Sequence, residues 1–153
     1  MIQKFRHSLQ CWMFFSVLII FSSALLVGAS KEEFQVRESV PSVKIESSVD
    51  RAIAETSEEV TLTIKLLTAK AFHQLEIPEI GDQLTGLRVV EFGQGEPENF
   101  AGEYQQTSRW YRVVADISGS YMIPAITLAY KDKDETKKVS TADIFIEFKV
   151  KVS

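Results

Sequence analysis

The sequence has few of the residues that build most catalytic and metal centres. It contains one cysteine, Cys11, and two histidines, His7 and His73. A zinc site needs three or four histidine, cysteine or carboxylate ligands, so these residues are a poor basis for one. The sequence also lacks a Gly-x-Ser-x-Gly elbow, a phosphate-binding loop and a dinucleotide-binding fingerprint. We therefore expect a protein that is not an enzyme and binds no cofactor.

Only His73 and two acidic clusters remain as candidates for chemistry. His73 stands between Phe72 and Gln74, and we interpret it as a loop histidine. Calcium takes oxygen ligands from loops of this kind, but the spacing does not follow a calcium-binding motif and lysines accompany the second cluster. We interpret both clusters as solvated loops, and we expect no metal site. The clusters consist of Glu91, Glu96, Glu98 and Glu103, and of Asp132, Asp134 and Glu135.

The first 29 residues carry no acidic side chain. Lys4 and Arg6 precede a strongly apolar run over residues 12–21, and small residues at 27–29 end the segment. This order is typical of a secretory signal. The uncharged stretch is also close to the length that spans a bilayer, so an uncleaved anchor is the alternative. Both interpretations predict export, to the periplasm or the extracytoplasmic face of the inner membrane, with membrane association if the anchor is uncleaved.

The predicted organisation is a signal peptide or N-terminal membrane anchor at 1–29, a linker at 30–42 and one domain at 43–153. The whole chain has a formal net charge of -4, and the 124 residues after the first 29 have one of -6. This acidic balance argues against binding to nucleic acid or to anionic membrane surfaces. Because Cys11 lies in the signal, the domain has no disulfide and must be stabilised by its core.

Apolar and polar residues alternate along most of the domain, with the period of half-buried strands. Val60, Leu62, Ile64 and Leu66 give the strictest pattern and should face inward. Seven strands and no helix outside the signal predict an all-β, Ig-like antiparallel β-sandwich. The predicted strands cover 43–49, 60–66, 74–78, 87–92, 104–115, 121–131 and 139–152. In the last strand Ile144, Ile146, Phe148 and Val150 should face inward.

Two strands show a break in their apolar phase. The first break falls between Val89 and Val90, and the second falls at Pro124. Each predicts a β-bulge or an edge position, because an irregularity of this kind is tolerated where one side of the strand is unpaired. The segment 93–103 contains several glycines and a proline and is predicted to be the longest loop.

Residues 116–124 predict a structural corner. Asp116, Gly119 and Tyr121 form a tight turn followed by a tyrosine, and Pro124 interrupts the next strand. In Ig-like sandwiches such a tyrosine fills the core while its hydroxyl bonds to backbone a few residues upstream. We therefore expect the chain to cross from one sheet to the other here.

Aromatic residues and arginine concentrate in protein interfaces, which makes residues 109–112 candidates for contact. We expect Trp110 to pack in the core, whereas Arg109 and Tyr111 remain candidates for an interface. The expected contact surfaces are the edge around Pro124 and the loop 93–103. The candidates from that loop are Glu96, Glu98 and Phe100.

The order of these pieces resembles the β-sandwich domains of bacterial BatD-like proteins, also called oxygen-tolerance or aerotolerance proteins. The resemblance covers nearly all of 43–152 and is carried by 48–52, 60–64, 75–78, 84–89, 109–112 and 119–126. It implies a membrane-associated, non-enzymatic envelope protein. The implied partners are von Willebrand A-type membrane proteins and a MoxR-type ATPase. BatD-like proteins are typically several times longer than this chain.

Together these features predict an exported protein that makes protein contacts in the bacterial cell envelope. The alternative is an envelope module that binds polysaccharide or calcium. A calcium-dependent rise in melting temperature would favour that alternative.

Overall fold

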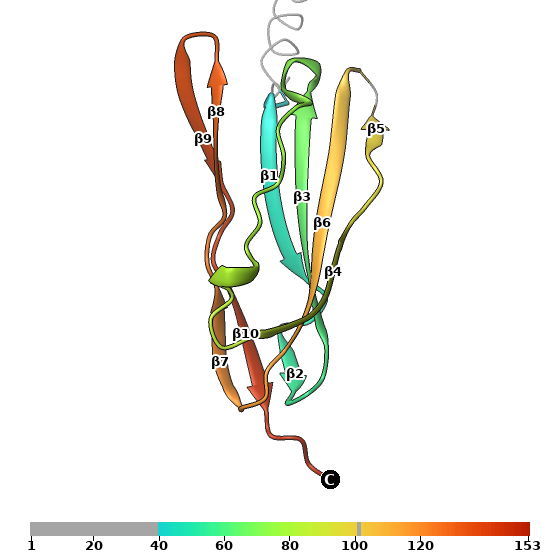
Figure 1. Cartoon of the computed structure of the whole chain (residues 1–153), viewed down its shortest axis with the longest axis vertical. Coiled ribbons are helices and arrows are strands. Elements are labelled where there is room, and N and C mark those ends of the chain that lie inside the picture. Colours follow the sequence, from blue (N-terminus) through green and yellow to red (C-terminus); the bar gives the residue numbers. More distant parts are fainter. Residues whose placement is uncertain (1–39, 101) are drawn as a thin grey trace, which may run out of the picture. The chain divides into compact units, whose positions relative to one another are not determined.

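The computed structural model describes residues 40–100 and 102–153. The predicted signal or anchor and most of the linker lie outside this range. The described part is all-β, with ten strands and two short 3-10 helices, and the strands form two layers (Figure 1). The predicted β-sandwich class is confirmed, although it is built from more and shorter strands than the seven predicted. No helix in residues 40–100 and 102–153 is long and apolar enough to cross a membrane.

The first layer is a five-stranded antiparallel sheet. Its strand order is β1 (Val43–Val49), β3 (Val60–Ala69), β6 (Tyr104–Val114) and β4 (Arg88–Gln94). The short β5 (Glu98–Phe100) also pairs with β6, beyond the end of β4. The long β3 and β6 lie side by side over their whole length (Figure 1), from Val60 opposite Val113 to Ala69 opposite Tyr104.

The second layer consists of a three-stranded sheet and a two-stranded hairpin that follows it. β10 (Ile144–Lys149) pairs antiparallel with β7 (Gly119–Ile123) and parallel with β2 (Ile53–Glu55). Further along, β8 (Thr127–Asp132) pairs with β9 (Glu135–Ser140). The parallel pair is a departure from the purely antiparallel sandwich that the sequence predicted.

The single strand predicted at 121–131, with a bulge or edge position at Pro124, is wrong: β7 ends at Ile123 and the chain resumes at Thr127 as β8, which belongs to another sheet. The predicted strand 139–152 is likewise divided, by residues 141–143. Side chains replace the ladder there: the backbone N–H of Ala125 donates to Asp143 Oδ1 (2.7 Å) and that of Ile126 to Thr141 Oγ1 (2.9 Å). The inward position predicted for Val150 is wrong, since it lies beyond β10 and is exposed.

The core lies between the layers and is centred on β3. Four alternate residues of this strand, Val60, Leu62, Ile64 and Leu66, are completely buried, as predicted. Ile146 and Phe148 of β10 are buried in the same cluster. Truncating a large aliphatic or aromatic core residue of this kind to alanine typically costs about 2–5 kcal/mol.

The segment between β3 and β4 is not the strand predicted at 74–78. It contains the helices η1 (Lys70–Phe72) and η2 (Gly81–Gln83) and otherwise has irregular backbone. Its apolar residues still point inward, since Ile77, Ile80 and Leu84 are buried. The segment crosses from β3 to β4 instead of running along a strand, so local turn bonds such as Gln83 N–H to Ile80 O satisfy its backbone. We call residues 73–87 the crossing segment.

The predicted irregularity in β4 is confirmed, because the register shifts by one residue between Val89 and Glu91. The loop predicted at 93–103 is shorter than expected. β4 continues through Gly93 and Gln94, and residues 98–100 form β5. Glycines in this region interrupt the strands less than we predicted because β6 supplies a partner along nearly its whole length.

The predicted corner forms between β6 and β7, where the chain passes from the first layer to the second. The Tyr121 hydroxyl donates to the carbonyl oxygen of Ile117 at 2.6 Å, and its ring packs edge-on against Phe148. Gly86 allows this close packing, because a Cβ there would lie 2.8 Å from Tyr121 Cε1. Asp116 accepts hydrogen bonds from Arg88 Nη2 (3.0 Å) and Nε (3.3 Å). This bonding to the guanidinium, together with its charge, lowers the pKa of Asp116.

We expect Tyr121→Phe to lower the free energy of unfolding by about 1 kcal/mol, the typical net value of one hydrogen bond. The ring and its packing on Phe148 are kept, so the loss isolates the hydroxyl. Tyr130→Phe is the matched control, because the Tyr130 hydroxyl makes no hydrogen bond within the described residues and its ring packs on Phe72. Urea denaturation of both variants checks this. Equal losses would contradict a specific role for the corner bond.

We also expect Asp116→Asn to lower the melting temperature slightly near neutral pH and not at all in strong acid. The folded pKa of Asp116 is depressed below 3.8. The contribution of the pair is therefore fully present above the unfolded pKa and is lost as the pH falls through the folded one. Melting curves from about pH 6 to pH 2 should show the difference closing below about pH 4. The exposed Glu96→Gln is the control. A difference that persists at pH 2 would refute the assignment.

Candidate functional site

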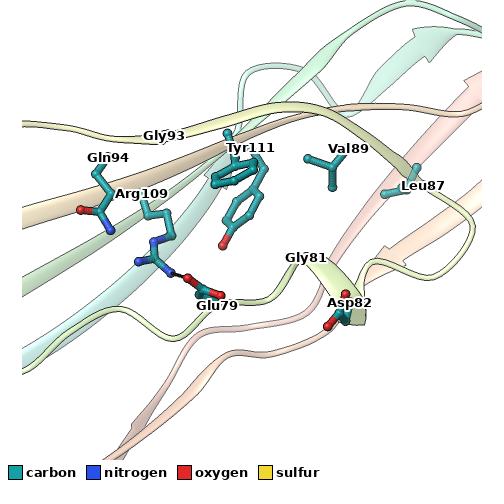
Figure 2. A pocket seen from close by; sticks show the side chains of 10 residues that line it. Glu79, Gly81, Asp82, Leu87, Val89, Gly93, Gln94, Arg109 and Tyr111 are labelled. Carbon is teal, nitrogen blue, oxygen red and sulfur yellow. Dashed lines mark ion pairs between the residues drawn. The ribbon is translucent and has the colours of Figure 1, made fainter.

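A cleft of about 560 Å³ opens where β4 and β6 face the crossing segment (Figure 2). One wall comes from the inner face of the first sheet and the other from the turn around η2. Both walls belong to the same compact unit, residues 41–153. The lining residues are Glu79, Gly81, Asp82, Leu87, Val89, Phe92, Gly93, Gln94, Arg109 and Tyr111.

Arg109 is the charged residue that extends from β6 into this cleft. In the ladder it stands opposite Ile64 of β3, so it lies on the inner, core-facing side of the sheet. Its side chain is only 11 % exposed. The Nη1 atom is buried and has no hydrogen-bond partner among residues 40–100 and 102–153. Its nearest carboxylate oxygen is Glu79 Oε1, at 3.8 Å (Figure 2).

The ion pair with Glu79 compensates little for the burial of Arg109. Its length is beyond hydrogen-bond distance, and the Glu79 side chain is 88 % exposed and therefore surrounded by water. A buried donor left without a partner costs about 1–3 kcal/mol, and more when the group is charged. Arginine keeps its charge in proteins, so it cannot avoid this cost by losing a proton. The cleft thus contains a fixed positive charge with an unused donor.

Two aromatic rings line the same cleft. Phe92 of β4 stands opposite Tyr111 of β6, and the rings stack with centroids 6.3 Å apart and an interplanar angle of 27°. Tyr111 is buried, and its hydroxyl accepts a hydrogen bond from the backbone N–H of Ile80 at 3.4 Å. Phe92 is 70 % exposed at the sheet edge. The cleft therefore has an aromatic floor and an exposed aromatic rim.

The bulge in β4 places Phe92 on this face. Val89 pairs with Val113 and Glu91 pairs with Arg112, so Val90 is the extra residue of the bulge. Glu91 then falls on the outer face, where its carboxylate lies 2.6 Å from Arg112 Nη1. The phase break is visible in the sequence, but Phe92 is not among the residues predicted to form an interface. The signal that could have identified Phe92 is an aromatic residue that follows a predicted bulge in the same strand.

The structure brings only some of the predicted interface residues together. Arg109 and Tyr111 share the cleft, whereas Glu96, Glu98 and Phe100 are exposed along the β4–β5 connection and on β5. The structure also reverses the expected placement of the two neighbouring aromatics. Tyr111 is buried in the core. Trp110 is half-buried on the outer face, where the Arg112 guanidinium lies 5.4 Å from its ring centroid.

Among the remaining candidates for chemistry, His73 and Asp132 have structural partners. His73 Nε2 lies 3.0 Å from the carbonyl oxygen of Glu103, at the end of η1. Lys137 Nζ lies 2.6 Å from Asp132 Oδ2, and this hydrogen bond lowers the pKa of Asp132 and raises that of Lys137. Within the described ranges, no group of three or more histidine, cysteine, aspartate or glutamate residues could hold a metal ion.

Comparison with known proteins gives no relative: no family model, curated protein or solved structure matches the chain. The resemblance to BatD-like proteins therefore remains a prediction from the sequence. The fold and the cleft define the class of the domain, an all-β sandwich with a charged cleft beside one sheet edge.

We expect Arg109→Met to raise the free energy of unfolding by about 1–3 kcal/mol, because methionine fills similar space without an unsatisfied buried donor. Arg112→Met is the matched control on the outer face of the same strand. Arg112 is well exposed and paired with Glu91, so its replacement should cost about 0–1 kcal/mol. Urea denaturation of the full-length variants checks both. Destabilisation by Arg109→Met would show that Arg109 supports the fold.

Proposed function

We propose that the chain is an exported, non-enzymatic module whose β-sandwich contacts another protein in the bacterial cell envelope. The observation that carries this proposal is the open edge of the first sheet, formed by β4 and β5. β4 is the last strand in the sheet order, and β5 pairs only with β6 within the described residues. Such an edge presents unpaired backbone groups to which a segment of another protein can add as a strand.

Two exposed aromatic side chains mark the same edge. Phe92 on β4 is 70 % exposed and Phe100 on β5 is 47 % exposed. Single exposed apolar residues are ordinary on protein surfaces, but aromatics are enriched where proteins meet. The acidic Glu96 and Glu98 lie between these two rings in the sequence and are exposed. Phe92 pairs with the inward Tyr111 and Phe100 with the outward Tyr104, so the two rings lie on opposite faces of the sheet. A segment added along this edge would meet one ring on each face and would pass the carboxylates between them.

The predicted signal or anchor supports an extracytoplasmic site of action. A secretory signal or an uncleaved anchor places the domain in the periplasm or at the outer side of the inner membrane. The resemblance to BatD-like proteins suggests the partners, which are von Willebrand A-type membrane proteins and a MoxR-type ATPase. Because a MoxR-type ATPase would act on the other side of that membrane, direct contact is proposed only with the von Willebrand A-type proteins.

The proposal predicts that Glu96→Lys with Glu98→Lys weakens capture of the partner. Charge reversal on the β4–β5 connection changes the polar rim of the contact along this edge and should reduce recovery several-fold. The full chain carries a C-terminal tag, intact cells of the source bacterium are crosslinked, and the membrane fraction is analysed by mass spectrometry. Asp134→Lys with Glu135→Lys is the matched control, because this exposed pair lies at the β8–β9 turn.

Recovery of one specific membrane protein, reduced by the first pair of substitutions and not by the second, supports the proposed surface. Unchanged recovery with Glu96→Lys and Glu98→Lys rejects this surface and leaves the edge around Pro124. Failure of the wild-type chain to capture any protein rejects the proposed function itself. Screens for calcium and glycan binding would then follow.

A further inference from the structure

We propose that the cleft at Arg109 is an anion-binding pocket that takes the carboxylate of an acidic side chain in an extended segment of the partner. The inference rests on the proposed function, since it specifies what part of the partner is recognised. The inference goes beyond the proposed function by specifying the two groups of the partner that bind: one carboxylate at Arg109 and an apolar side chain against Phe92. Three features of the cleft lead to this ligand.

The first feature is the unused donor. Arg109 Nη1 is buried in the cleft with no hydrogen-bond partner among residues 40–100 and 102–153, and Glu79 is too distant to supply one. Because Nη1 is covered, a ligand carboxylate would take the place of the exposed Glu79 side chain and approach to the usual 2.7–2.9 Å of a charge-assisted hydrogen bond, roughly 1 Å closer than Glu79 lies. Such a bond is strong where the surrounding protein excludes water. An anion in the cleft would thus offset the cost of burying this charge.

The second feature is the charge at the mouth of the cleft. Glu79 and Asp82 line the opening, and both are exposed. Two carboxylates disfavour a multiply charged anion such as a phosphate group or an acidic polysaccharide. The other nearby arginines are engaged, since Arg88 pairs with Asp116 and Arg112 pairs with Glu91. A single carboxylate on an otherwise apolar or basic segment therefore suits the cleft best.

The third feature is the position of the cleft under a free sheet edge. Gln94 of β4 stands opposite Arg109 of β6. Neighbouring strands are about 4.8 Å apart, so a strand added to β4 would run roughly 10 Å from the β6 backbone. An arginine and a glutamate side chain together span that distance. Alternate residues of a strand face the same side of the sheet, and Gln94 and Phe92 are two residues apart in β4. In the added strand, the residue two positions from the acidic one would therefore lie beside Phe92.

The experiment uses an array of heptapeptides with systematically varied sequence. Each peptide is made in two forms, one with an amidated C-terminus and one with a free carboxylate. The probe is the full-length protein in detergent micelles, and the affinities of the best peptides are measured by fluorescence anisotropy. We expect amidated peptides with one glutamate or aspartate and an apolar residue two positions away to bind best. Replacing the acidic residue with its amide should weaken binding at least tenfold.

Three variants assign the binding to the cleft. Arg109→Gln should abolish preference for the acidic residue, so the acidic peptide and its amide counterpart bind equally. Phe92→Ser should weaken binding several-fold and keep that preference. Phe145→Ser is the matched control, because Phe145 is also an exposed aromatic but lies on β10 in the other layer. It should have no effect. Circular dichroism of each variant confirms that it is folded.

Selection of peptides without an acidic residue, or acidic peptides bound equally by Arg109→Gln, would overturn the proposed pocket. A requirement for the free C-terminal carboxylate would overturn the assignment to an internal side chain. Binding of no peptide would also overturn it. These results are separable from failure of the proposed function, because crosslinking in cells detects a protein partner whether or not Arg109 takes part.

Discussion

The rest of the domain depends on the packing of the inner face of β3 against the second layer. Its four completely buried aliphatic residues meet Ile146 and Phe148 from β10 in one cluster. The chain's single cysteine lies in the predicted signal, so a disulfide cannot replace this packing. Exposed ion pairs each contribute at most about 1 kcal/mol, and truncation of one core residue costs more than that. The position of β3 therefore fixes the position of β6, and β6 fixes the position of β4.

The candidate site is a continuation of this core. Along β6 the inward positions pass from Val113 to Tyr111 and then to Arg109, in the same alternation. Val113 is completely buried, Tyr111 is buried beneath Phe92, and Arg109 lies in the cleft. A strand that is held rigidly by the core thus positions the charged group, which is the arrangement that precise recognition requires. The crossing segment supplies the opposite wall because its own apolar residues are anchored in the same core.

The sequence allowed prediction of features that depend on local pattern. The inner face of β3 follows from strict alternation, the bulge in β4 from a phase break, and the corner from a turn followed by Tyr121. The sandwich class follows from these features together. Alternation at Leu75 and Ile77 was misleading, because a crossing segment with inward apolar residues has the same pattern as a short strand. The sequence could not show which of Trp110 and Tyr111 faces the core, since a shift of one residue in the strand register exchanges their two faces.

The cleft could not be predicted because it joins three segments that are distant in the sequence, around residues 79–82, 87–94 and 109–111. The sequence identified Arg109 as a contact candidate, but not that it would be buried without a hydrogen bond. The parallel pairing of β2 with β10 was missed for the same reason: it joins a three-residue strand near the start of the domain to its last strand.

The proposed recognition role gives a physical reason for the burial of Arg109. Arg88 and Arg112 differ from Arg109, because both are well exposed: Arg88 pairs with Asp116 and Arg112 with Glu91, and their remaining donors are open to water. Arg109 occupies a more buried position than either, and its Nη1 has no hydrogen-bond partner in the part of the chain that the structure describes. Charged groups left incomplete in this way concentrate at functional sites, where the ligand supplies the missing partner. The large apolar core gives the domain enough stability to tolerate that cost at one edge of the sheet.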